Sequence, residues 1–239
     1  MKKALLCATA AAGLVSVGAT AHAQDGWYGV GKVGAVVDGI QDVDATGPNK
    51  NGQIDALLSP KVDPVFNLGI GYGFEAFRLE GVVGYRNSKM DVPNTFVGTR
   101  PAGVAGPDGA ASTRVTTLFV NAIKDFDMGG NVVPYLGVGV GAARVDSKVS
   151  SLYAAPGGFP RNGFDDSDTS FAYNALAGFG IKMSEQLTVD IGYTYTAAQD
   201  LSWQGRDGGY EGRWDEHAVN AGIRWQFAAP PPPAPPPPP

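Results

Sequence analysis

The sequence predicts an all-β protein: an eight-stranded antiparallel up-and-down transmembrane β-barrel with four long outer loops and three short periplasmic turns. Apolar residues recur with a period of two in eight segments, and long and short connections alternate between these segments. The charged residues of the segments share one strand face with the glycines. The net charge of −5 and the lack of a run of about 20 apolar residues exclude a basic nucleic-acid binder and a protein that spans a membrane with helices.

The first residues predict a secretory signal peptide over residues 1–23. Lys2 and Lys3 precede an apolar stretch, and the small-residue triplet Ala21-His22-Ala23 gives a cleavage site before Gln24. The single cysteine, Cys7, lies inside this segment. The mature chain is therefore expected to contain no disulfide and no thiolate metal site.

Residues 24–227 form the predicted barrel domain. The eight strand segments cover residues 27–38, 64–72, 77–88, 113–125, 132–145, 170–183, 187–198 and 216–227. The connections between them hold 25, 4, 24, 6, 24, 3 and 17 residues. This strict alternation is typical of a chain that crosses the outer membrane repeatedly, with short turns in the periplasm and long loops outside.

The charged residues predict which face of each strand points into the barrel. A Lys or Arg that faces lipid at mid-bilayer costs about 2–4 kcal/mol, so a charge within a strand should point into the lumen. The luminal polar side chains predicted in this way, besides four charged residues, are Asn121, Asn174, Lys182 and Asn220. A soluble eight-stranded barrel would instead fill its interior with apolar side chains.

Four luminal charges are expected at a similar depth in the periplasmic half of the barrel: Lys32, Glu80, Asp190 and Arg224. Two cations and two anions in a narrow lumen should pair, because an unpaired charge there would be costly. Two interpretations of this luminal charge cluster stay open. It could act as a gate or plug, or it could be static polar filling of a bore that eight strands leave nearly closed.

Aromatic residues near the predicted periplasmic strand ends are expected to form a membrane-interface girdle. They are Trp27, Phe77, Phe126, Tyr135, Trp225 and Phe227. In the last outer loop, Trp203, Tyr210 and Trp214 could serve as exposed adhesion contacts or could pack against the barrel rim.

Other candidate chemistry is not favoured by the sequence. Asp165, Asp166 and Asp168 could gather divalent ions, but a solvated acidic loop is the favoured interpretation. His217 is the sole histidine after residue 23, and no Ser or Asp motif accompanies it. We therefore expect no enzyme activity, no cofactor and no metal site.

The chain ends in a proline-rich segment, residues 228–239, that should form a stiff polyproline II spacer. The opening run from Gly26 to Gly34, the ending run from His217 to Phe227 and this spacer together resemble the N-terminal barrel of the outer membrane protein A family. In that family such a spacer leads to a C-terminal peptidoglycan-binding domain, which this sequence does not contain. The resemblance thus implies peptidoglycan as a partner of a longer form.

The sequence as a whole favours a structural role. We expect an outer-membrane anchor with surface loops, and a small passive pore for ions or small solutes is the alternative. The expected location is the outer membrane, with both mature termini in the periplasm. The expected partners are outer-membrane lipid and lipopolysaccharide, with no nucleic acid, and the barrel is expected to be monomeric.

Overall fold

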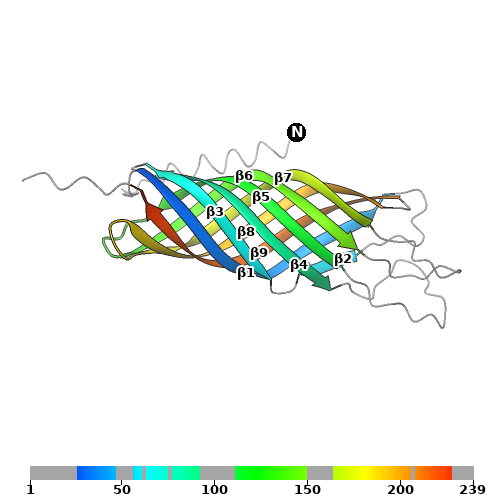
Figure 1. The fold of residues 1–239 in the computed structure, drawn as a ribbon, viewed down its shortest axis with the longest axis horizontal. Coiled ribbons are helices and arrows are strands. Elements are labelled where there is room, and N and C mark those ends of the chain that lie inside the picture. The colour runs from blue at the N-terminus through cyan, green and yellow to red at the C-terminus, as the bar shows by residue number, and fades with distance from the viewer. Residues whose placement is uncertain are drawn as a thin grey trace, which may run out of the picture.

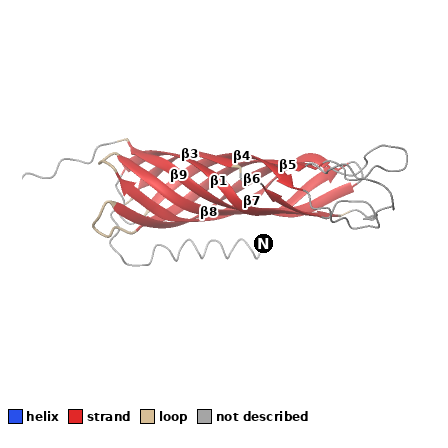
Figure 2. Cartoon of the chain, turned by 90° about the horizontal axis from the view of Figure 1, so that it is seen from below, coloured by secondary structure: helices blue, strands red, loops and turns tan. Residues whose placement is uncertain are grey.

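The computed structural model describes residues 26–46, 56–60, 63–74, 77–91, 111–149, 164–205 and 208–227. Within these ranges the chain forms β-strands and no helix (Figure 2), hence no helix that could cross a membrane. The predicted signal peptide, residues 1–23, and the proline-rich tail, residues 228–239, lie outside the described residues. The strands are β1 (Gly26–Ala45), β2 (Ala56–Pro60), β3 (Pro64–Gly73), β4 (Arg78–Asp91), β5 (Ala111–Asp125), β6 (Val132–Val149), β7 (Phe164–Lys182), β8 (Leu187–Gly205) and β9 (Gly208–Gln226).

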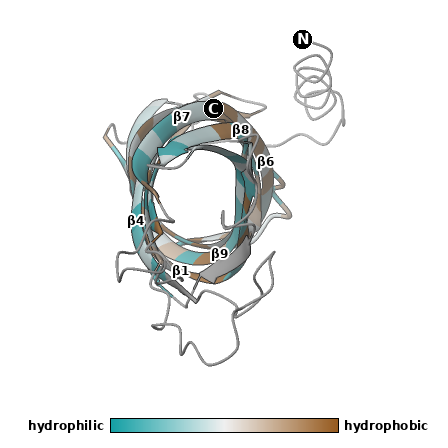
Figure 3. Ribbon diagram, turned by 90° about the vertical axis from the view of Figure 1, so that its right-hand side faces the viewer, coloured by the Kyte–Doolittle hydropathy of each residue, from teal (hydrophilic) through white to brown (hydrophobic). Residues whose placement is uncertain are grey.

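The strands close into a ring in which every neighbour pair is antiparallel (Figures 1 and 3). β1 pairs with β3 on one side and with β9 on the other, where the register runs from Tyr28 opposite Gln226 to Ala45 opposite Tyr210. The short strand β2 pairs with β1 and with β4, as β3 does, so β2 and β3 together occupy one position of the wall. The ring therefore has eight positions, which confirms the predicted eight-stranded barrel.

The two ends of the barrel differ in their connections. At the end where β1 begins and β9 ends, here called the terminal end, residues 74–77, 126–131 and 183–186 join successive strands. At the opposite end, here called the loop end, β1, β4, β6 and β8 end and β5, β7 and β9 begin (Figure 1).

The prediction of a long fourth outer loop is wrong. The sequence pattern placed a 17-residue loop after residue 198, whereas β8 continues to Gly205 and β9 already begins at Gly208. The other predicted strands, except β3, also extend further toward the loop end than predicted; β6, for example, reaches Val149. The prediction stopped each strand where the apolar outward face stopped, and the strands continue beyond that point.

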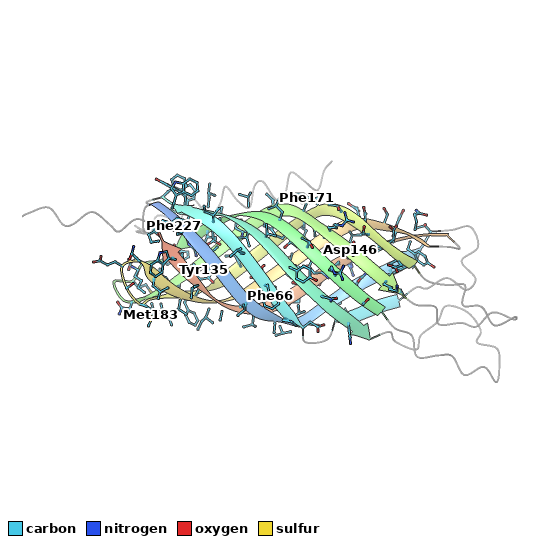
Figure 4. All side chains as sticks on the ribbon, in the orientation of Figure 1. Phe66, Tyr135, Asp146, Phe171, Met183 and Phe227 are labelled. Carbon is cyan, nitrogen blue, oxygen red and sulfur yellow. The ribbon has the colours of Figure 1, made fainter. Side chains whose placement is uncertain are left out.

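The outside of the barrel carries a continuous belt of exposed apolar side chains. Phe66, Phe171 and Phe227, which are labelled in Figure 4, each expose more than half of their surface. Other exposed members of this belt are Val33, Leu68, Val83, Leu118, Val120, Leu136, Val140, Phe179, Ile191, Val219 and Ile223. An apolar belt on the outer face is the signature of a barrel that spans a bilayer.

Near the loop end the two faces exchange character while the period of two continues. On β6 the outward residues become Arg144, Asp146 and Lys148, and the inward residues become Val145 and Val149. The same exchange occurs on the loop-end parts of β1, β8 and β9. This part of the barrel therefore has the polar exterior and apolar interior of a water-soluble barrel.

Candidate functional site in the barrel interior

The four charges that the sequence predicted for the lumen lie together near the terminal end. Lys32 Nζ lies 3.5 Å from Glu80 Oε2, and Arg224 Nη2 donates a hydrogen bond of 3.1 Å to Asp190 Oδ1. Glu80 and Asp190 are almost completely buried. The strand alternation therefore brings all four side chains to one level of the interior.

Two further residues, which sequence reasoning missed, join these pairs into one network. The Arg78 guanidinium forms an ion pair with Glu80, and its Nε donates a 2.9 Å hydrogen bond to Asp125 Oδ2. The same Asp125 oxygen lies 3.6 Å from Arg224 Nη1. The resulting ionic network consists of Lys32, Glu80, Arg78, Asp125, Arg224 and Asp190, with cations and anions alternating along it.

A sequence signal for the two missed residues was present. Arg78 precedes Glu80 by two positions and Asp125 follows Asn121 by four, so both share the inward parity of residues that were assigned correctly to the lumen. Both stand at a strand end, where a charge can also be placed in a turn.

Two tyrosine rings fill the space around the ionic network. The Tyr28 hydroxyl donates a hydrogen bond of 3.1 Å to Glu80 Oε1, and its ring lies against Gly71, where a Cβ atom would come within 2.3 Å of the ring. The Arg78 guanidinium carbon lies 5.2 Å from the centre of the Tyr135 ring. These contacts place the cations over aromatic faces, which adds cation–π attraction to the ion pairs.

Tyr135 is therefore not an interface residue. It was assigned to the outer girdle because it lies near a strand end, but it exposes only 4% of its surface and shares the inward parity of Gly137. Trp27, Trp225 and Phe227 do point outward and are about half exposed. Phe77 and Phe126, which border the turns of the terminal end, are partly exposed.

Asparagine side chains occupy the middle of the interior. Asn174 Nδ2 donates a 3.0 Å hydrogen bond to Asn121 Oδ1, and Asn220 Nδ2 donates a 3.2 Å hydrogen bond to Thr194 Oγ1. The fourth predicted luminal polar residue, Lys182, does not reach the lumen. It has the inward parity but lies at the rim of the terminal end, where its partly exposed ammonium lies 3.2 Å from Asp127 Oδ2.

The loop-end half of the interior holds an apolar plug of buried side chains. Trp203 is completely buried and stacks on Phe164 with ring centres 5.5 Å apart, and Tyr210 packs against the same ring at 4.8 Å. The plug comprises Val43, Ala111, Val115, Phe119, Ala143, Val145, Val149, Phe164, Ala172, Ala198, Leu201, Trp203, Tyr210 and Trp214.

This packing corrects the prediction for the last outer loop. The sequence leaves open whether Trp203, Tyr210 and Trp214 are exposed adhesion contacts or rim contacts, and the structure shows that they are buried inside the barrel wall. They belong to strands that continue beyond the apolar belt, where the inward face is the apolar one. The signal was their alternation with Ser202, Glu211 and Arg213, which has the period of a strand.

Polar groups inside and just below the plug are mostly paired. Arg86 forms a buried ion pair with Glu216, and its guanidinium carbon lies 4.6 Å from the centre of the Trp214 ring. Higher up, Gln41 Nε2 donates a 2.9 Å hydrogen bond to Ser147 Oγ. The Trp203 indole nitrogen donates to the Val145 carbonyl oxygen at 3.3 Å.

The three aspartates Asp165, Asp166 and Asp168 form contacts between neighbouring strands of the barrel wall. Asp166 and Asp168 accept hydrogen bonds of 2.8 Å from the backbone amides of Gln204 and Ser202, at a register shift between β7 and β8. Asp165 Oδ2 lies 2.6 Å from Lys148 Nζ. No group of His, Cys, Asp and Glu side chains that could hold a metal ion occurs among the described residues.

His217 is not part of a luminal site. Its side chain contacts the Tyr193 hydroxyl, and Tyr193 belongs to the exposed outer face. The ring of Tyr195 lies 5.0 Å from the histidine ring. His217 therefore contributes to an aromatic group on the outside of the barrel.

Comparisons with known proteins agree with this geometry. Residues 7–227 match the family described as outer membrane protein beta-barrel domain. The outer membrane protein PagN of Salmonella typhimurium is 28% identical over 207 residues, covering 79% of this chain and 81% of that protein. An uncharacterized protein of Brucella abortus is 29% identical over 138 residues, or 47% of each chain.

One solved structure shows the same fold at low sequence identity. The outer membrane protein OprG of Pseudomonas aeruginosa aligns with a TM-score of 0.53 and 18% identity, covering 87% of this chain and 99% of that one. Neisserial surface protein A aligns with a TM-score of 0.46 and 18% identity, over 84% of this chain and 97% of that one. From the match over residues 7–227, this chain belongs to the outer membrane protein β-barrel family.

Proposed function

We propose that this protein is a closed structural barrel, which anchors its surface loops in the outer membrane and does not conduct. The observation that carries the proposal is the filling of the interior at two levels. Near the terminal end the ionic network crosses the lumen, with Glu80 and Arg78 fully buried. Near the loop end the apolar plug crosses it, with Trp203 fully buried.

The small passive pore is the alternative, and the interior argues against it. An aqueous path would have to pass side chains from both levels, and eight strands leave a bore only just wide enough for side chains. On this proposal the ionic network and the plug are permanent filling, and neither opens as a gate.

The proposed orientation places the terminal end in the periplasm and the loop end outside the cell. Short connections at one end and longer separations between strands at the other support this, because outer-membrane barrels carry their short turns on the periplasmic side. Both ends of the barrel domain then lie in the periplasm, where a proline-rich tail could reach peptidoglycan through a further domain. We expect the barrel to be monomeric, with the signal peptide removed.

Outer-membrane lipid and lipopolysaccharide are the proposed partners of the outer surface. The apolar belt fits lipid chains, and just above it four exposed cations lie on three neighbouring strands: Lys89, Arg114, Arg144 and Lys148. β5 pairs with β4 and β6 so that Lys89 and Lys148 both flank Ser112. Arg144 and Lys148 form ion pairs with Asp146 and Asp165, and exposed cations at this height suit the phosphate groups of lipopolysaccharide.

A liposome swelling assay on the purified barrel tests the proposed function. The chain, refolded into vesicles, should admit small sugars no faster than protein-free vesicles, while a wider-barrel porin gives rapid swelling. Heat-dependent gel mobility confirms that the barrel is folded in the same sample. Swelling comparable to that of the porin would rule out the closed barrel and favour the pore.

A further inference from the structure

Between the ionic network and the apolar plug, the interior contains a cavity of about 50 Å³. Asn121, Asn174 and Asn220 line it together with Thr117, Thr194 and Thr196. Lys32 borders it from the side of the ionic network, and Arg86, Glu216 and Phe119 border it from the side of the plug. Val65, Val82, Leu176 and Ala218 also line it, so the cavity has both polar and apolar walls and lies between two closed levels of the barrel.

Three residues that line this cavity each hold a buried polar atom without a hydrogen-bond partner among the described residues: Asn174 Oδ1, Asn220 Oδ1 and Arg86 Nε. Their side chains are buried, with exposed fractions of 7%, 6% and 4% for the three residues. A buried polar atom without a partner costs about 1–3 kcal/mol. Three such atoms around one small space indicate that this space holds their partner.

The chemistry of the three atoms selects water as that partner. Two of them are acceptors and one is a donor, and a water molecule can donate to the first two and accept from the third. A monovalent cation would lie near the positive charges of Lys32 and Arg86, and an anion would face both carbonyl oxygens and the Glu216 carboxylate. Neither ion satisfies donors and acceptors together.

The volume agrees with a small cluster of water molecules. A water molecule needs about 10–15 Å³ of such cavity volume, so the space accommodates about three to five. We propose that the middle of the barrel is a water-binding chamber, closed by two barriers of unlike chemistry that act in series. The inference rests on the proposed closed barrel and adds where its water lies and what confines it.

The two barriers exclude solutes for different reasons. The ionic network has three cations and three anions, so it is neutral as a whole, and an ion that passes must displace tightly paired charges. The apolar plug consists of aromatic and aliphatic side chains, and polar groups beside it, such as Gln41 and Ser147, are hydrogen-bonded to each other. A hydrated ion therefore gains little there, which makes this level a hydrophobic barrier. Because the chamber separates them, opening one barrier leaves the other intact.

The chamber is tested by nuclear magnetic resonance of the barrel refolded in nanodiscs, with the asparagine side chains labelled with ¹⁵N. Cross-relaxation with long-lived water is expected at the side-chain amides of Asn174 and Asn220. The exposed turn residue Asn131 serves as control, because it contacts only rapidly exchanging water. The variant Asn220→Leu fills the chamber and should remove the signal at Asn174. Wild-type amides without long-lived water would overturn the chamber.

The series arrangement is tested by conductance in planar bilayers. One variant removes a neutral pair from the ionic network, Asp190→Ser with Arg224→Ser. A second opens the plug, Trp203→Ala with Tyr210→Ala, two residues that face each other across β8 and β9. Each variant should stay within about twofold of wild type, and the variant with all four substitutions should conduct at least about tenfold more.

Folding of each variant is checked by heat-dependent gel mobility, and single substitutions replace any pair that does not fold. A single-barrier variant that conducts as well as the four-substitution variant would overturn the series arrangement. So would a folded four-substitution variant that stays closed. Conductance of the wild type itself would instead contradict the proposed function, so the two failures are distinguishable.

Discussion

Replacing Trp203 by alanine should strongly destabilise the barrel, although Trp203 lies only three residues before the tip of the last hairpin. Its side chain is completely buried in the apolar plug, stacks on Phe164 and donates a hydrogen bond to the Val145 carbonyl. Truncation of a buried tryptophan to alanine costs about 3–5 kcal/mol, because transfer energy and cavity formation add. A loss of about 4 kcal/mol changes the ratio of folded to unfolded protein about a thousandfold.

The measurement is urea unfolding in lipid vesicles, followed by the gel mobility of the folded barrel, since this readout does not depend on tryptophan fluorescence. Trp225→Ala is the matched control, because Trp225 faces outward and is 47% exposed. Its loss should cost less than about 2 kcal/mol. If Trp203→Ala cost no more than Trp225→Ala, the apolar plug would not be packed as described and the barrel would lose its loop-end barrier.

Three further substitutions test other levels of the wall and interior, each by the same urea unfolding. Glu80→Ala leaves Arg78 short of a carboxylate partner and should cost about 3–5 kcal/mol, whereas a loss under about 1 kcal/mol would mean that the pair is solvated. Gly71→Val forces the Tyr28 ring to move and should cost about 1–3 kcal/mol; unchanged stability would show that the ring is free to turn. Leu118→Arg puts a charge in the apolar belt and should cost about 2–4 kcal/mol, a penalty that must vanish if this face is wet.

The sequence was sufficient to predict the barrel within the apolar belt. Within the belt, a charged side chain such as Glu80 or an amide side chain such as Asn121 must point into the lumen. Because side chains alternate along a strand, one such residue determines the direction of all the others. Antiparallel pairing with short turns needs no information beyond the spacing of the segments. Eight strands and their facing followed from these two constraints.

The full length of the strands could not be predicted from the sequence pattern, because the outer face of each strand passes from lipid to water along its length. Beyond the belt the outward residues contact water, so Val145 and Trp203 turn inward where the same rule would have pointed apolar residues outward. Apolar residues among polar ones then look like a loop. The period of two continued through this region and was the better guide to the end of β8.

The partners within the interior depend on neighbours from distant strands. Arg78 meets Asp125 because β4 and β5 are adjacent in the ring, and Asp125 meets Arg224 across the lumen. Parity identifies which residues face inward, but it gives no height for a side chain in a tilted strand. The contact between Phe164 and Trp203 in the plug likewise could not be predicted, because both residues lie beyond the predicted ends of their strands.

The extension of the strands has a consequence for what can touch this protein from outside. A strand of 19 residues such as β9 rises about 45 Å along the axis at about 3.3 Å per residue and a tilt of about 40°, while the apolar band of such barrels is about 25 Å tall. The remaining part of the barrel, about 20 Å long, extends beyond the lipid as a rigid cylinder. With the loop end outside the cell, as proposed, antibodies or phage fibres would meet this end of the barrel at the height of the surface sugars, far from the fatty acyl chains.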